Sequence, residues 1–135
     1  PDFEVKRVVF ASDFTVESVP VYQKALKLFR TWDTKVHLVY INLPHVKFKS
    51  TREIKQETDA FLRIAHHGEI PEDIKVDHIN DYTVEEGLYY YAEDRDANLI
   101  ALPTHGRQGL AHFFQGSIGE DLANRAGLPV MTFKM

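Results

Sequence analysis

The sequence predicts a single α/β domain built on a five-stranded parallel sheet with helices on both faces. Short apolar runs alternate with segments of helical periodicity, which gives five predicted strands and four predicted helices. The connections between them are short, and this alternation is typical of a parallel sheet with crossover helices. Residues 99–102 are apolar throughout, as in strands buried on both faces. At 135 residues the chain is long enough to bury one full core.

The first half of the chain predicts two strands and two helices. The strands are expected at 6–11 and 36–41, and the helices from residue 19 onward and over 51–66. Each helix carries one apolar stripe at three- and four-residue steps, which is the period of a helix packed on a core. The stripe of the first helix comprises Tyr22, Ala25, Leu26, Phe29 and Trp32. The stripe of the second comprises Ile54, Phe61, Leu62 and Ala65.

The second half predicts three strands and two further helices. Residues 74–79 alternate apolar with polar, as an edge or half-exposed strand does. Thr83 and Glu86 have the spacing of a capping box ahead of a helix whose apolar positions are Val84, Leu88 and Tyr91. After the strand at 99–102, Ser117 and Glu120 repeat that spacing, and Gly127 can end the fourth helix. The last strand is expected at 129–133.

Composition excludes several classes of function. The formal net charge of −4 and the pI of about 6.0 argue against DNA or an anionic membrane as the main partner. The absence of cysteine excludes disulfides, thiol catalysis and thiolate metal sites. No apolar run approaches the roughly 20 residues of a membrane span, and no signal peptide is visible, so a cytoplasmic protein is expected. Because the first residue is Pro1, we expect a processed chain or one domain of a longer protein.

Three stretches follow directly after predicted strands and are expected to meet at one end of the sheet. They are Asp13, Ile41 and the loop 103–117. In parallel α/β sheets, ligands sit beyond the carboxyl ends of the strands. Asp13 is suited to accept hydrogen bonds from sugar hydroxyls or to help hold a divalent ion, and equally suited to cap a turn.

The loop after the fourth strand reads PTHGRQGLAHFFQGSIGEDL over 103–122. Gly116 and Ser117 at a helix start would leave backbone N–H groups facing outward, which favours a bound phosphate. The simpler alternative is that Ser117 only caps the helix and Gly116 turns the chain. His105 is a candidate ligand donor beside Gly106, or a loop histidine with partners of its own.

These residues resemble a known nucleotide-binding signature. Gly-x-x-Gly, nine residues, then Gly-Ser or Gly-Thr is the signature of the universal stress proteins. This chain has Pro103-Thr104-His105-Gly106, then nine residues, then Gly116-Ser117. The stretch FASDF at 10–14 is similar to the first strand of the same family, and the resemblance extends from that strand to the last one.

The resemblance implies a Rossmann-like fold of the HUP or adenine-nucleotide alpha-hydrolase-like type. It also implies that the ligand is an adenine nucleotide, ATP or AMP, which Mg²⁺ could accompany. Asp13 would bind the ribose, and the backbone around Ile41 would meet the adenine. The full set of implied contact residues is Ala11, Ser12, Asp13, Ile41, Leu102, Pro103, His105, Gly106, Gly116, Ser117, Ile118 and Gly119. Members commonly dimerise through the last strand, here Val130–Phe133, which agrees with the need to pair an exposed apolar edge. A tandem sister domain would use the same surface.

Pro103 departs from the signature, because it stands where the first glycine is expected. Proline lacks an N–H, so one donor near the ribose is lost, at a cost on the order of 1 kcal/mol. Two functions therefore compete: an adenine-nucleotide-binding stress protein, and a dimerisation or stress-signalling partner of the same fold that binds no nucleotide. No catalytic set emerges, because Ser117 has no evident base, so slow ATP hydrolysis is the most that we expect of an enzyme.

Two further motifs carry weaker signals. Residues 106–109, Gly-Arg-Gln-Gly, match the Gly-x-x-Gly loop of KH domains, but the order of elements and the negative charge disfavour nucleic acid. His66 and His67 are adjacent on a helix, where neighbouring side chains diverge, so they make a poor pair of metal ligands.

Overall fold

The computed structural model describes residues 4–45, 47–103 and 127–134. Its five strands form one sheet in the order β3-β2-β1-β4-β5, with every neighbouring pair parallel. The strands are β1 (Arg7–Ala11), β2 (Lys35–Asn42), β3 (Val76–Asn80), β4 (Leu99–Pro103) and β5 (Val130–Phe133). The predicted parallel α/β sheet is therefore confirmed, with β3 and β5 at its edges.

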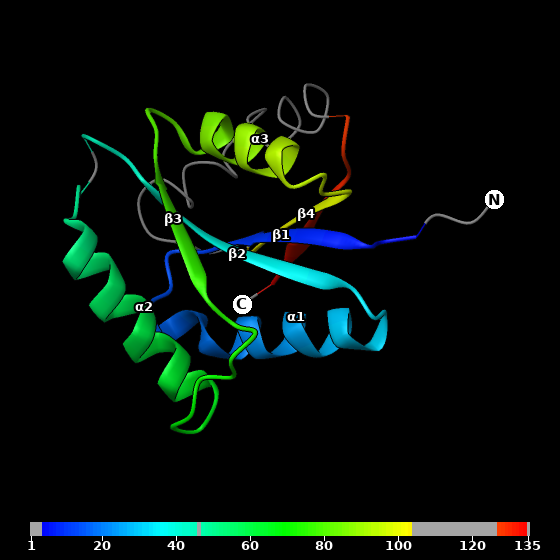
Figure 1. Ribbon diagram of the computed structural model, residues 1–135, viewed down its shortest axis with the longest axis horizontal. Helices are drawn as coiled ribbons and strands as arrows, with labels where there is room; N and C mark the ends of the chain where they lie inside the picture. The colour runs from blue at the N-terminus through cyan, green and yellow to red at the C-terminus, as the bar shows by residue number, and fades with distance from the viewer. Residues whose placement is uncertain (1–3, 46, 104–126, 135) are drawn as a thin grey trace.

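Helices cover both faces of this sheet, as predicted (Figure 1). On one face lie α1 (Val19–Thr31), which follows a 3-10 turn at Val16–Ser18, and α2 (Thr51–Ala65); α3 (Val84–Asp94) lies on the other. The start of α2 is fixed by a capping box, in which Ser50 accepts from the Glu53 N–H and the Glu53 side chain accepts from the Ser50 N–H. Thr83 accepts from the Glu86 N–H at the start of α3, where the sequence predicts a cap.

The two faces of the sheet hold two hydrophobic clusters. The cluster under α1 and α2 contains most of the predicted stripes of both helices, with Tyr22, Phe29, Phe61 and Leu62 nearly or fully buried. The cluster under α3 contains Leu88 and the strand residues that point to that side. All five residues of β4 are buried, as its uniform apolar run predicts.

The structure corrects one predicted core position. Trp32 was expected on the buried stripe of the first helix, but α1 ends at Thr31 and Trp32 is its C-cap. The next residue, Asp33, has a positive φ of 54°, so the chain turns away there. The Trp32 ring contacts Phe29 at 5.8 Å between centroids and remains 42% exposed.

The predicted fourth helix, with Ser117, Glu120 and the loop before it, lies outside the described residues.

Candidate functional site

A pocket of about 440 Å³ opens at the carboxyl ends of β1 and β2. The turn after β1, the end of β2, the segment before α2 and one side of α2 form its walls. Its lining residues are Ser12, Asp13, Phe14, Thr15, Val16, Glu17, Tyr40, Ile41, Leu43, Lys47, Lys49, Glu57, Ala60, Phe61, Ile64 and Val84. Two of the stretches predicted to converge, at Asp13 and at Ile41, therefore line one pocket.

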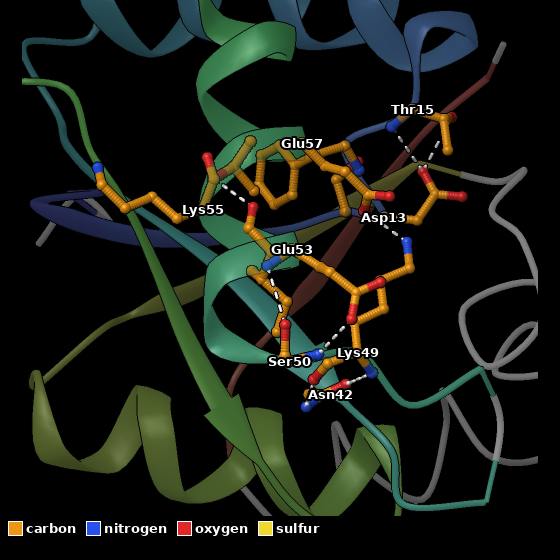
Figure 2. Close-up of polar contacts among 12 residues, drawn as sticks. Asp13, Thr15, Asn42, Lys49, Ser50, Glu53, Lys55 and Glu57 are labelled. Carbon is orange, nitrogen blue, oxygen red and sulfur yellow. Dashed lines mark hydrogen bonds and ion pairs between the residues drawn. The ribbon is translucent and has the colours of Figure 1, made fainter.

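Asp13 lies in a turn that is held by short-range hydrogen bonds. Its Oδ1 accepts from the Thr15 N–H at 3.3 Å and from the Thr15 hydroxyl at 3.1 Å (Figure 2). It also accepts from the Ser18 hydroxyl at 3.1 Å. The buried Ser12 hydroxyl accepts from the N–H of Phe14, whose φ of 52° is uncommon for a residue other than glycine. Asp13 thus closes the turn before α1, which is one of its two predicted roles, and it also lines the pocket.

The backbone of Ile41 is directed toward the pocket. The Val39 carbonyl accepts from the Ser12 N–H, on the β1 side, and the Asn42 carbonyl accepts from the Asp81 N–H, on the β3 side. Because backbone groups alternate between the two sides of a strand, the N–H and C=O of Ile41 point to the β1 side. The paired stretch of β1 ends at Ala11, opposite Val39, whereas β2 continues to Asn42. The edge of β2 at Ile41 thus extends beyond β1, where a ligand can reach it.

Lys49 and Glu57 form an ion pair in the pocket wall, with 2.6 Å between Lys49 Nζ and Glu57 Oε2. The ammonium also lies 5.7 Å from the centre of the Tyr40 ring. Burial acts to lower the pKa of Lys49, but the hydrogen bond and charge of Glu57 and the contact with Tyr40 outweigh it and raise the pKa. Burial raises the pKa of the Tyr40 hydroxyl, so Lys49 stays charged and Tyr40 neutral at pH 7.

The predicted site residues fall into three groups. Ser12, Asp13 and Ile41 line the pocket. Ala11 and Leu102 have no exposed surface, and Pro103 is the buried last residue of β4. The predicted residues His105, Gly106, Gly116, Ser117, Ile118 and Gly119 lie outside the described residues.

Sequence reasoning did not find Lys49 and Glu57. Asn42 offered a signal, because an amide at the end of an apolar strand is buried only when it has partners, and two lysines follow within seven residues. The side chain of Asn42 is 2% exposed and bonds the backbone of Lys49 in both directions.

The described residues add two observations on metals and membranes. Among them, no group of three or more histidine, cysteine, aspartate or glutamate side chains is placed to hold a metal ion. His66 Nε2 is instead 2.7 Å from the Tyr22 hydroxyl, which gives this histidine a partner in the core. Within the described ranges, no helix has the length and apolar character that a membrane crossing requires.

Fold and pocket together define a parallel α/β domain with a ligand-sized pocket at the carboxyl ends of its strands. A model of the universal stress protein family matches residues 4–134. The chain belongs to the universal stress protein family. No curated protein matches it.

Three of the solved structures similar to the chain are universal stress proteins. One, in complex with cAMP, is 17% identical, with a TM-score of 0.65 and 98% of each chain covered. A second, from Archaeoglobus fulgidus in complex with dAMP, is 20% identical with a TM-score of 0.55, and the match covers 96% of this chain and 98% of that chain. A third, from Archaeoglobus fulgidus DSM 4304, is 20% identical with a TM-score of 0.61, and the match covers 96% of this chain and 44% of that chain. At these identities the likeness shows the fold.

Proposed function

We propose that the pocket binds an adenine nucleotide, ATP or AMP, and that the protein acts in a stress response as a binding module. The observation that carries this proposal is that Asp13 and the outward-facing backbone of Ile41 line one pocket. Its volume of about 440 Å³ falls within the roughly 300–1,000 Å³ of small-molecule sites. Two similar universal stress proteins are in complex with cAMP and dAMP, which supports the same ligand class here.

The strand order suggests how the nucleotide would lie. Along the carboxyl edge of the sheet, β2 stands beside β1 and β4 stands on the other side of β1. The base would lie at Ile41 near the end of β2, and the ribose at Asp13 after β1. The phosphates would extend toward the segment after β4, where the sequence places Gly116 and Ser117 at a predicted helix start.

Calorimetric titration with ATP and with AMP, each with and without Mg²⁺, tests the proposal. We expect saturable binding of at least one nucleotide, and weaker binding in Asp13→Asn, which has one carboxylate oxygen fewer for the ribose. Asp59→Asn is the control, because Asp59 pairs with Lys55 on α2 and does not line the pocket. The proposal fails if the folded protein binds neither nucleotide at millimolar concentration.

A second candidate function is a dimerisation or stress-signalling partner without a nucleotide, and Pro103 favours it. If proline removes only one donor, Pro103→Gly should tighten ATP binding about tenfold. If its ring blocks the ligand, the same change should create binding where none was measurable. Gly116→Val should abolish binding in either case, with Arg107→Ala as the control in the same loop. If neither Pro103→Gly nor Gly116→Val changes the titration, this candidate gains.

Dimerisation through β5 remains a proposal under either function. Among the described strands β5 pairs with β4 alone, so its outer edge faces away from the sheet. Met131 is half-buried there and would be covered by a second subunit. Phe133, the other residue considered for that contact, is only 7% exposed because it packs against Phe10 and Phe29 in its own chain. Light scattering that gives a monomer at high concentration would exclude the homodimer and leave a tandem sister domain as the alternative.

A further inference from the structure

The Lys49–Glu57 ion pair lines the same pocket as Asp13 and Ile41. Lys49 immediately precedes the N-cap of α2, and Glu57 lies two turns into that helix. Figure 2 shows Lys49 and Glu57 on the side of α2 that faces Asp13, and Lys55 directed to the opposite side. Lys49 contacts the Tyr40 ring with its ammonium and the Asn42 side chain with its backbone. These two residues flank Ile41, so a base at Ile41 would lie near the ion pair.

Lys49 is held in this position by a buried polar anchor. Asn42 Nδ2 donates to the Lys49 carbonyl at 3.0 Å, and Asn42 Oδ1 accepts from the Lys49 N–H at 3.2 Å. The same Nδ2 donates to Asn80 Oδ1 at 2.9 Å, which ties this anchor to β3. Ser50, the next residue, caps α2. The backbone on both sides of the Lys49 side chain is thus fixed to the sheet and to the helix.

This ion pair differs from a second one on the same helix. Lys55 and Asp59 pair at 3.2 Å, but 75% of the Lys55 side chain is exposed, and neither residue lines the pocket. The Lys49 side chain is 26% exposed and lies over Tyr40. Pairs like Lys55–Asp59 contribute little to stability. The Glu57 side chain is 51% exposed, so the difference lies in the partial burial of the Lys49 side chain, in its anchor and in the place of the pair in the pocket wall.

We propose that Glu57 and Lys49 contact the edge of the base and make the pocket selective for a purine that carries a 6-amino group. The inference rests on the proposed adenine-nucleotide function. An ammonium has three N–H donors, and Glu57 uses one of them; a carboxylate can accept several hydrogen bonds. Adenine presents an amino donor beside ring-nitrogen acceptors. Glu57 accepts from the amino group and Lys49 donates to the adjacent ring nitrogen.

Selectivity is tested by calorimetric titration with adenosine and with purine riboside, which lacks the 6-amino group. The wild-type protein should prefer adenosine, because without the amino group the Glu57 carboxylate loses a partner. Glu57→Gln, which keeps the size of the side chain, should reduce that preference roughly tenfold. Lys49→Met, which keeps an unbranched side chain over Tyr40, should weaken the binding of both adenosine and purine riboside. Lys55→Met and Asp59→Asn are the matched controls and should leave both affinities within twofold.

Titration with adenosine, AMP and ATP separates contact with the base from contact with the phosphates. If Lys49 contacts the base, Lys49→Met should weaken all three by the same factor. If the loss of affinity in Lys49→Met is larger for AMP than for adenosine and larger still for ATP, Lys49 lies at the phosphates and the inference is overturned. It is also overturned if wild type binds adenosine while Glu57→Gln keeps the full preference. If folded wild type binds none of the three ligands, the proposed function itself fails, and the inference with it.

Discussion

The two faces of the sheet are built from different kinds of side chain. Under α1 and α2, ring contacts run from Phe133 in β5 through Phe10 and Tyr22 to Phe61, with centroids 6.4, 6.1 and 5.2 Å apart along the series. Under α3 the buried residues of the strands are aliphatic or alanine, and a polar group formed by Asp77, Tyr91 and Arg95 lies beside them.

The aromatic face also forms a wall of the pocket. Phe61 packs edge to face against Phe14 at 5.2 Å, and both residues line the pocket. Large rings bury much area for little side-chain entropy, so they give this wall a rigid base. The α3 face contributes Ile41, Leu43 and Val84 to the lining. The pocket therefore has aromatic rings on the α1–α2 side and aliphatic side chains on the α3 side.

The largest effect is expected from Phe10→Ala in β1. Phe10 is 1% exposed and contacts both Tyr22 and Phe133, so its removal leaves a cavity in the middle of the ring series. The free energy of unfolding should fall by about 3–5 kcal/mol. Urea denaturation, followed by circular dichroism, measures this loss.

The neighbouring residue provides the control on the other face. Val9 is also fully buried, but it belongs to the aliphatic cluster under α3. Val9→Ala removes fewer atoms and should cost about 2 kcal/mol. If Val9→Ala were as costly as Phe10→Ala, the two faces would not differ in the way that their composition suggests.

An intermediate loss of unfolding free energy is expected when the hydroxyl of a buried tyrosine is removed, and each face of the sheet has one such tyrosine. Tyr91 donates to Asp77 Oδ2 at 2.7 Å, and Arg95 lies 3.4 Å from the same oxygen. Tyr91→Phe leaves a partly buried carboxylate with one partner fewer and should cost about 1.5–3 kcal/mol, as for hydrogen bonds to charged groups.

Tyr22→Phe is the counterpart on the aromatic face and should cost less, about 1 kcal/mol, because His66 is a neutral partner. Thermal unfolding of both variants at pH 7.5 compares them. A larger loss for Tyr22→Phe would indicate that the ring series, and not the charged pair, is the more sensitive region.

The sequence predicts the fold well because the fold follows from periodicity. The stripe of α1, the cap at Thr83 and the uniform run of β4 are local patterns, and each has the predicted structural outcome, apart from Trp32 at the helix end. Asp13 and Ile41 could be predicted because strand ends converge in any parallel sheet. Lys49 leaves no periodic pattern, because its position depends on tertiary bonds to Asn42 and β3, and its one signal in the sequence is the polar Asn42 at a strand end.

The smallest effect concerns one histidine on each face. Burial lowers the pKa of His37, with the positive charges of Lys35 and Arg95 adding to it, and burial also lowers that of His66. A histidine with a folded-state pKa below its unfolded value of about 6.5 binds protons more readily after unfolding. The stability that both residues contribute is therefore present above pH 6.5 and is lost as the pH falls from there through the folded-state pKa.

Leucine substitutions separate the two histidines. In the described part of the chain, buried His37 Nε2 has no hydrogen-bond partner, whereas His66 Nε2 contacts the Tyr22 hydroxyl. His37→Leu should therefore be neutral or stabilising at pH 7.5, and its advantage over wild type should grow at pH 5.5, because the variant no longer takes up a proton there. His66→Leu should lose stability at pH 7.5, since it leaves Tyr22 unpaired. Urea midpoints at the two pH values measure both changes. An advantage of His37→Leu that does not grow on acidification would show that His37 is not the titrating group.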